Sequence, residues 1–215
     1  MTAGSGGKVQ AVSVRTHTVM ERQDKMVTIG FDPWTRTRTI HDLPADEVIS
    51  TLQKEIRRGN EENAALCAYE MVCTSAELER KLWDRLCIIS VEDIGFGEPQ
   101  APILIQTLWE MSQRFGRSEG DRYTFAIHAV RYLATRQKDR SSDEMHNWLS
   151  HAVTHQGLRP TIPDYAIDMH TARGIALGRG MREFLLEGSK VAPELPNRDK
   201  RYRERLLGII KTQDK

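Results

Sequence analysis

The chain contains few cysteines and no long apolar run, and both absences narrow what it can be. Its three cysteines, Cys67, Cys73 and Cys87, form no CxxC pair. An odd number without metal-ligand spacing favours buried thiols in a reducing compartment over disulfides, metal ligands or a nucleophile. No apolar stretch approaches the roughly 20 residues that cross a bilayer. The N-terminus also lacks the apolar core of a signal peptide, so we expect a cytoplasmic protein with no membrane contact.

A strong net charge is also absent, although the charges are unevenly distributed. The formal net charge of +1 argues against a surface that coats nucleic acid broadly. From Arg173 to Lys215, however, the sequence contains eleven Lys and Arg residues but only six Asp and Glu residues. This excess predicts either a solvated helix face or a grip on a phosphate backbone. Four residues near the C-terminus would make that grip: Arg198, Lys200, Arg201 and Arg203.

The motifs of common catalytic sites are missing. No GxxxxGK[ST] loop occurs, and without it the β- and γ-phosphates of ATP have no cradle of backbone amides, lysine and hydroxyl. HExxH metal spacing and the GxSxG elbow are absent as well. We therefore predict no metal, no cofactor and no ATP hydrolysis by this chain alone. Other enzyme activity stays open, with a non-enzymatic role favoured.

The spacing of apolar residues predicts a mostly α fold. Residues 1–25 have no sustained period and are expected to be flexible. Alternation over residues 26–41 predicts a short β-like arm, which needs to dock on helices or on a second subunit. From residue 42 the period becomes about 3.6, as in helices. We divide the rest into a helical domain, residues 42–152, and a Gly- and Arg-rich segment with C-terminal helices, residues 153–215.

Capping residues predict where several helices begin. Asp42 can cap a first helix that ends at Gly59, and Asn60 can cap the second. Thr74 and Glu77 fit a capping box at the start of a third helix. Later helices are expected over four stretches: residues 101–115, 121–136, 181–191 and 198–210. A shorter one is expected after Ser142.

Several blocks of sequence together resemble one known family. Ser90-Val-Glu-Asp-Ile-Gly95 with Pro99-Gln-Ala101 resembles an SEDVG…DPQA block, and Glu119-Gly120 with residues 126–138 resembles EG…AxxYLAxxxK. Residues 52–57 and 63–65 resemble the helices that precede these blocks. The family is the RarA/MgsA-type AAA+ ATPases, relatives of clamp loaders, and the resemblance covers the helical C-terminal part over residues 45–150. No alignment extends into residues 160–215.

The resemblance implies an all-helical domain that packs subunits together. In this family the region forms homotetramers, so we expect a homo-oligomer here, either a dimer or a tetramer. The chain lacks the ATPase part, so it resembles the assembly half made as a separate protein. The expected function is a non-enzymatic oligomerising or adaptor module of replication and recombination, which contacts DNA or a replication or repair protein.

The segment from Asp164 to Gly180 is the strongest alternative site. Asp164 and Asp168 lie four residues apart, and His170 and Arg173 lie three apart, so each pair can share a helix face. Arg179 lies between two glycines whose backbone amides can bind an anion. The segment predicts either an irregular connection held by ion pairs or a phosphate, nucleotide or nucleic-acid site. The second alternative would make the protein a nucleotide- or phosphate-binding enzyme.

A pair of adjacent carboxylates is the other candidate. Glu92 and Asp93 follow an apolar helix within the block that resembles the family. They predict either a structural pairing with a cap or an arginine, or a catalytic carboxylate pair. Within the related domain the structural alternative is favoured.

Overall fold

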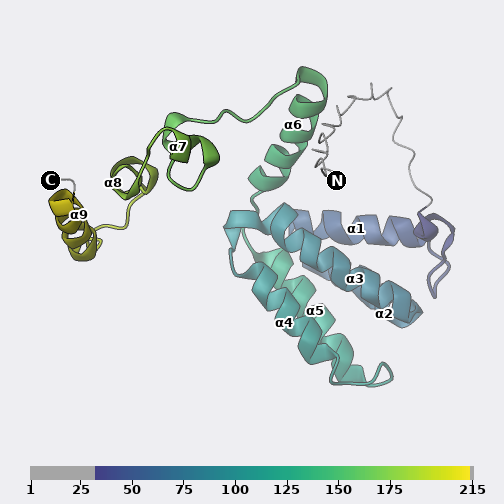
Figure 1. Ribbon diagram of the computed structural model, residues 1–215. Helices are drawn as coiled ribbons and strands as arrows, with labels where there is room; N and C mark the ends of the chain where they lie inside the picture. Colours follow the sequence, from purple (N-terminus) through teal and green to yellow (C-terminus); the bar gives the residue numbers. More distant parts are fainter. Residues whose placement is uncertain (1–31, 214–215) are drawn as a thin grey trace, which may run out of the picture. The chain divides into compact units, whose positions relative to one another are not determined.

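The computed structural model describes residues 32–213, and these residues are helical with no β-strand among them. This confirms the mostly α fold class (Figure 1). They divide into two compact units, with the boundary between Asp143 and Glu144. That boundary falls in the first turn of α6 (Ser141–Gln156). Within the described part, no helix is both long and apolar enough to cross a membrane.

The first unit is a bundle of amphipathic helices (Figure 1). In it, α2 packs against α1, α3 and α5, and α4 packs against α5. Leu52 and Ile56 of α1 and Leu82 and Leu86 of α3 are fully buried. Each such side chain contributes roughly 1.5–3 kcal/mol by leaving water. The bounds of the helices are Ala45–Arg58 for α1, Glu61–Thr74 for α2, Ala76–Ile89 for α3, Ala101–Ser112 for α4 and Gly120–Thr135 for α5.

The N-terminal caps differ from those predicted. Asp42 has a left-handed φ of 60° and lies before the start of α1, so it does not cap that helix. Asn60 occupies the N-cap position of α2, but its side chain makes no capping hydrogen bond. The cap of α3 is Ser75, one residue after Thr74, and its Oγ accepts a hydrogen bond of 3.1 Å from the N–H of Leu78.

Residues 1–31 lie outside the described part, and they include the flexible segment expected over residues 1–25 and the first part of the β-like arm expected over residues 26–41. The described part of the arm, residues 32–41, contains no strand. A 3-10 helix, η1 (Pro33–Arg36), forms there because Asp32 accepts a hydrogen bond from the N–H of Trp34, at 3.1 Å. Asp followed by Pro favours such a turn. One antiparallel bridge, between Arg38 and Pro44, is the remaining extended pairing among residues 32–213.

This segment docks on α2, one of the two alternatives predicted for the arm. The N–H of Ile40 donates to Oγ1 of Thr74 at 3.0 Å. Glu70 accepts from the N–H of His41 at 3.1 Å, and its other oxygen lies 2.6 Å from Nδ1 of that histidine. Burial acts to raise the pKa of Glu70, but hydrogen bonds from Thr39 and His41 outweigh it, and the pKa lies below its ordinary value.

Two glycines after α3 allow an unusually close backbone approach. Asp139, between α5 and α6, donates its N–H to the carbonyl of Asp93 at 3.0 Å. A Cβ on Gly95 would lie 2.4 Å from the carbonyl oxygen of Asp139, and one on Gly97 would lie 2.5 Å from that of Gln137. Larger residues would therefore push this connection away. The turns that carry these glycines are a π-helical turn, η2 (Ser90–Ile94), and a 3-10 turn, η3 (Gly95–Gly97).

The second unit consists of α6, which is longer than predicted, followed by short elements and one further helix. The helix predicted over residues 181–191 is a single turn that continues as a π-helical turn and ends at Gly188. The final helix begins at Arg201, whose N–H donates to the carboxylate of Asp199 at 2.9 Å. The elements are η4 (Asp164–Ala166), α7 (Ala172–Ala176), α8 (Met181–Glu183), η5 (Phe184–Gly188) and α9 (Arg201–Gln213).

Candidate functional site

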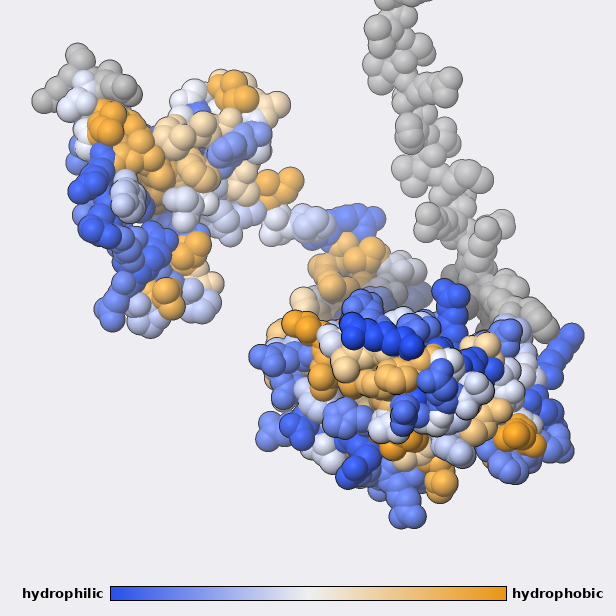
Figure 2. Space-filling view, turned by 90° about the horizontal axis from the view of Figure 1, so that it is seen from below, coloured by the Kyte–Doolittle hydropathy of each residue, from blue (hydrophilic) through white to orange (hydrophobic). Residues whose placement is uncertain are grey.

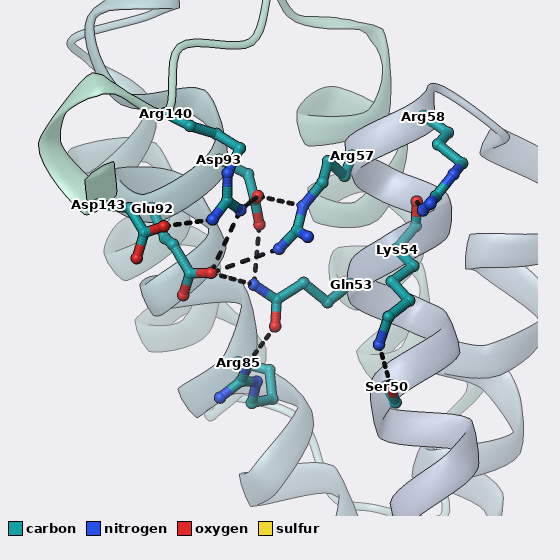
Figure 3. Close-up of polar contacts among 10 residues, drawn as sticks. All are labelled: Ser50, Gln53, Lys54, Arg57, Arg58, Arg85, Glu92, Asp93, Arg140 and Asp143. Carbon is teal, nitrogen blue, oxygen red and sulfur yellow. Dashed lines mark hydrogen bonds and ion pairs between the residues drawn. The ribbon is translucent and has the colours of Figure 1, made fainter. Parts of the chain in front are cut away.

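Asp93 lies at the centre of a polar cluster in the first unit (Figure 3). Its side chain is fully buried, and its Oδ1 accepts from Nε of Arg57 and Nη1 of Arg140, each at 2.5 Å. Oδ2 accepts from the side-chain amide of Gln53 at 2.9 Å. A carboxylate taken out of water costs several kcal/mol unless it is paired. Three donors from two segments of the chain, α1 and the connection between α5 and α6, compensate that cost here.

Glu92 forms the outer edge of the same cluster. Its Oε1 accepts from Gln53 at 3.0 Å and lies 3.3 Å from Nη2 of Arg57 and 3.4 Å from Nη1 of Arg140. Gln53 also accepts from Arg85 of α3. Burial acts to lower the pKa of Arg140, but the hydrogen bond and charge of Asp93 outweigh it and raise the pKa above its ordinary value. The cluster therefore joins α1, α3, the π turn and the α5–α6 connection.

This geometry favours a structural role for Glu92 and Asp93. A carboxylate that works as a general acid or base must reach a proton on the substrate. Asp93 is inaccessible to solvent, and arginine and amide donors occupy both of its oxygens. We interpret the pair as a joint that holds the helices in register, which agrees with the favoured alternative.

A second buried carboxylate, Glu79 of α3, was not foreseen from the sequence. Nε of Arg117 donates to it at 2.8 Å and Nε of Arg122 at 2.6 Å. The sequence did carry a signal, because Glu79 lies three residues before Leu82 and four before Trp83, on the apolar face of its helix. An acid on such a face is expected to have a buried cationic partner.

In the second unit, Arg179 closes the segment that begins at Asp164. Its Nη2 donates to both carboxylate oxygens of Asp164, at 2.7 and 2.9 Å, and this hydrogen bonding lowers the pKa of Asp164. Its Nη1 donates to the backbone carbonyls of Asp164 and Ile167, at 2.7 and 2.6 Å. Arg179 therefore acts as a clamp on the loop, which is the structural alternative for this segment.

The other predicted residues of this segment separate into a local pair and an exposed cation. Asp168 accepts from the N–H of His170 at 2.9 Å and lies 3.1 Å from its Nδ1, and these bonds lower the pKa of Asp168. The ring of His170 stands edge-on to Phe184 at 5.0 Å. Arg173 is exposed. The shared helix face predicted for Asp164 and Asp168 does not form, because Asp164 begins a short 3-10 turn that ends at Ala166, before Asp168.

The cavity beside this segment has the wrong charge for a phosphate. It has a volume of about 330 Å³, and Arg179 is the one cation among its lining residues. An anion in this cavity would meet repulsion from four carboxylates, so the cavity does not favour a phosphate. Among residues 32–213 no group of His, Cys, Asp and Glu could hold a metal ion. The lining carboxylates are Asp164, Asp168, Glu183 and Glu187.

The basic residues predicted near the C-terminus have acidic partners that the sequence did not reveal. Glu194 accepts from Nζ of Lys200 at 2.7 Å and lies 3.2 Å from Nε of Arg198. Arg201 pairs with Asp199 at 2.8 Å. In Figure 2 the C-terminal helices show apolar surface directly beside hydrophilic surface. Three of the predicted basic residues line one cavity of about 480 Å³: Arg198, Lys200 and Arg203.

Comparison with known proteins agrees with this helical architecture. Residues 59–185 match the family described as MgsA AAA+ ATPase C terminal. The chain belongs to this family. The match to the MgsA C-terminal family begins after residues 45–58 and includes both Asp93 and Arg179. It runs to residue 185, so the expectation that no alignment extends into residues 160–215 is wrong for residues 160–185. The cavity formed by residues 189–203 lies outside it.

A curated protein is similar in sequence to this MgsA-type chain. The chain is 28% identical over 124 residues to the Replication-associated recombination protein A of Haemophilus influenzae. This stretch covers 58% of the chain and 26% of that protein, so the chain spans about a quarter of the relative's length. The chain is thus related to the C-terminal part of RarA/MgsA-type replication and recombination proteins.

Proposed function

We propose that the chain is a non-enzymatic module that self-associates and acts in DNA replication or recombination in the cytoplasm. Its family and the name of its relative support the process. The observation that carries the proposal is an exposed apolar face on α6. We call this face the α6 stripe, and it consists of Met145, Trp148, Leu149 and Val153.

The α6 stripe has the spacing of a helix face that packs against a partner. Its residues lie at positions i, i+3, i+4 and i+8, so they form one side of the helix. Between 38% and 58% of each side chain remains exposed. Soluble proteins seldom leave a contiguous apolar face open to water unless it binds something. We assign the stripe to a second copy of the chain, in a dimer or tetramer.

Sedimentation equilibrium tests this assignment. We expect the chain to form an oligomer, and Trp148→Glu to shift it toward the monomer because a buried charge at the stripe is costly. Thr154→Glu, at an exposed position on the opposite side of α6, is the matched control and should leave the oligomer unchanged. A chain that stays monomeric at high micromolar concentration would overturn the proposal, as would equal effects of the two variants.

We further infer that the C-terminal basic residues contact DNA. Arg198, Lys200, Arg201 and Arg203 would neutralise backbone phosphates, so the binding should weaken with salt. Fluorescence anisotropy at several salt concentrations measures this dependence. Arg201→Ala should reduce the slope of log affinity against log salt by about one. An unchanged slope would refute the DNA contact. If the chain bound a replication or repair protein but no DNA, a protein contact would take the place of the DNA contact in the proposal.

A further inference from the structure

The charged residues that line the cavity between η5 and the start of α9 are mostly cations. Its volume is about 480 Å³, and its charged lining residues are Lys190, Glu194, Arg198, Lys200 and Arg203. This charge is opposite to that of the cavity beside Arg179. A cavity of this size and sign has room for a phosphate group together with part of a sugar.

Counting the charges around the cavity distinguishes two kinds of phosphate. Lys190 pairs at 2.6 Å with Glu187, which is outside the lining. With Glu187 and Glu194 included, four cations face two carboxylates, which leaves an excess of two positive charges. A phosphate monoester carries close to two negative charges at pH 7, because its second pKa is about 6. A phosphodiester within a DNA strand carries one.

From this match we propose that the cavity binds a phosphate monoester, present either at the 5′ end of a DNA strand or on a free nucleotide. The inference rests on the DNA contact proposed above and names the group that is recognised. Arg203 is already oriented for this role, because its Nη2 donates to the carbonyl of Leu185 at 2.6 Å. A guanidinium held in this way loses little side-chain freedom when an anion binds.

Glu194 competes with the incoming phosphate. The hydrogen bond from Lys200 is the main cause that lowers the pKa of Glu194, so this carboxylate is ionised at neutral pH. Nε of Arg198 is buried and lies 3.2 Å from Glu194 without forming a hydrogen bond. The carboxylate thus leaves one of its two cations incompletely satisfied. Removing its charge should strengthen phosphate binding, an effect opposite to that expected of a purely structural ion pair.

Isothermal titration calorimetry with the whole chain tests the proposal. The probes are a deoxynucleoside 5′-monophosphate and one single-stranded oligonucleotide made with either a 5′-phosphate or a 5′-hydroxyl. Lys200→Ala should weaken binding of both phosphate monoesters about tenfold, as loss of a charged hydrogen-bond donor does, and Lys200→Arg should restore it. Glu194→Gln should strengthen it about threefold. Arg205→Ala removes an equal charge outside the cavity and should have little effect.

The outcomes separate the cavity from the wider DNA contact. Stronger binding of the 5′-phosphate oligonucleotide than of the 5′-hydroxyl one, together with opposite effects at Lys200 and Glu194, supports the proposal. Equal binding of the two oligonucleotides with no nucleotide binding overturns the cavity site and leaves the DNA contact standing. Nucleotide binding without oligonucleotide binding supports the cavity site and overturns the DNA contact. Equal losses in Lys200→Ala and Arg205→Ala also overturn the cavity site, because general charge then explains the binding.

Discussion

Replacing Asp93 by asparagine should destabilise the first unit by about 3 kcal/mol, the lower end of the cost of breaking a buried ion pair. The substitution keeps the size of the side chain and removes only its charge. Arg57 and Arg140 would then share a site without their central anion. Their side chains are 31% and 29% exposed, so partial hydration limits the loss.

Urea unfolding, monitored by tryptophan fluorescence, measures this loss in the free energy of unfolding. In a unit of this size the same loss lowers the melting temperature by about 10 °C. Glu92→Gln is the matched control, because it removes a neighbouring charge from the same cluster. Glu92 is 24% exposed and reaches the arginines at 3.3 and 3.4 Å. Its loss should cost less than about 1 kcal/mol, as for exposed pairs.

The comparison of these two variants decides whether Asp93 is the joint of the bundle. A loss in Asp93→Asn no greater than that in Glu92→Gln would refute the reasoning. A double-mutant cycle of Asp93→Asn with Arg57→Met should also show coupling, because the two side chains share a direct bond. Additive losses would mean that the burial of Asp93, and not its pairing, sets the cost.

Three further substitutions test other parts of the fold. Glu79→Gln should cost about 3 kcal/mol in urea unfolding, since it leaves two arginines without their buried anion. Gly97→Ala should cost about 2 kcal/mol in the same assay, because the added carbon would lie 2.5 Å from the carbonyl oxygen of Gln137. Because the pKa of Glu70 is lower in the folded protein than in the unfolded chain, where it is about 4.3, the ionised side chain stabilises the fold at pH values above 4.3. This stability is lost as the pH falls through the pKa of the folded protein. Glu70→Gln should therefore flatten the fall in melting temperature between pH 6 and pH 3, and an unchanged fall would contradict this.

Local patterns predicted the helices well because the residues that decide them lie close together in the chain. The 3.6-residue spacing of Leu78, Leu82 and Leu86 corresponds to a buried stripe on α3. Gly59 ends α1 as predicted, since its left-handed backbone suits the end of a helix. Caps were less certain, because Thr74 and Ser75 offer the same hydroxyl one residue apart.

The residues of the candidate sites were visible in the sequence, but their partners were not. The family resemblance drew attention to Glu92 and Asp93, yet Arg57 and Arg140 lie 36 and 47 residues away from Asp93. Spacing along the chain carries no information about such contacts, since they depend on how helices pack. The glycines at 95 and 97 carry a function that the sequence alone did not reveal, which is the close approach of the α5–α6 connection.

By itself, the sequence determined the helical class, the family and the basic character of the C-terminal end, because these depend on composition, period and short motifs. Only the tertiary structure decided which charges face each other. In the folded chain Arg179 pairs with Asp164, and further carboxylates line the cavity beside that pair. A separate cavity is lined by Lys190, Arg198, Lys200 and Arg203. Electrostatic energy depends on distance and burial in three dimensions, and two segments of similar composition can therefore form cavities of opposite sign.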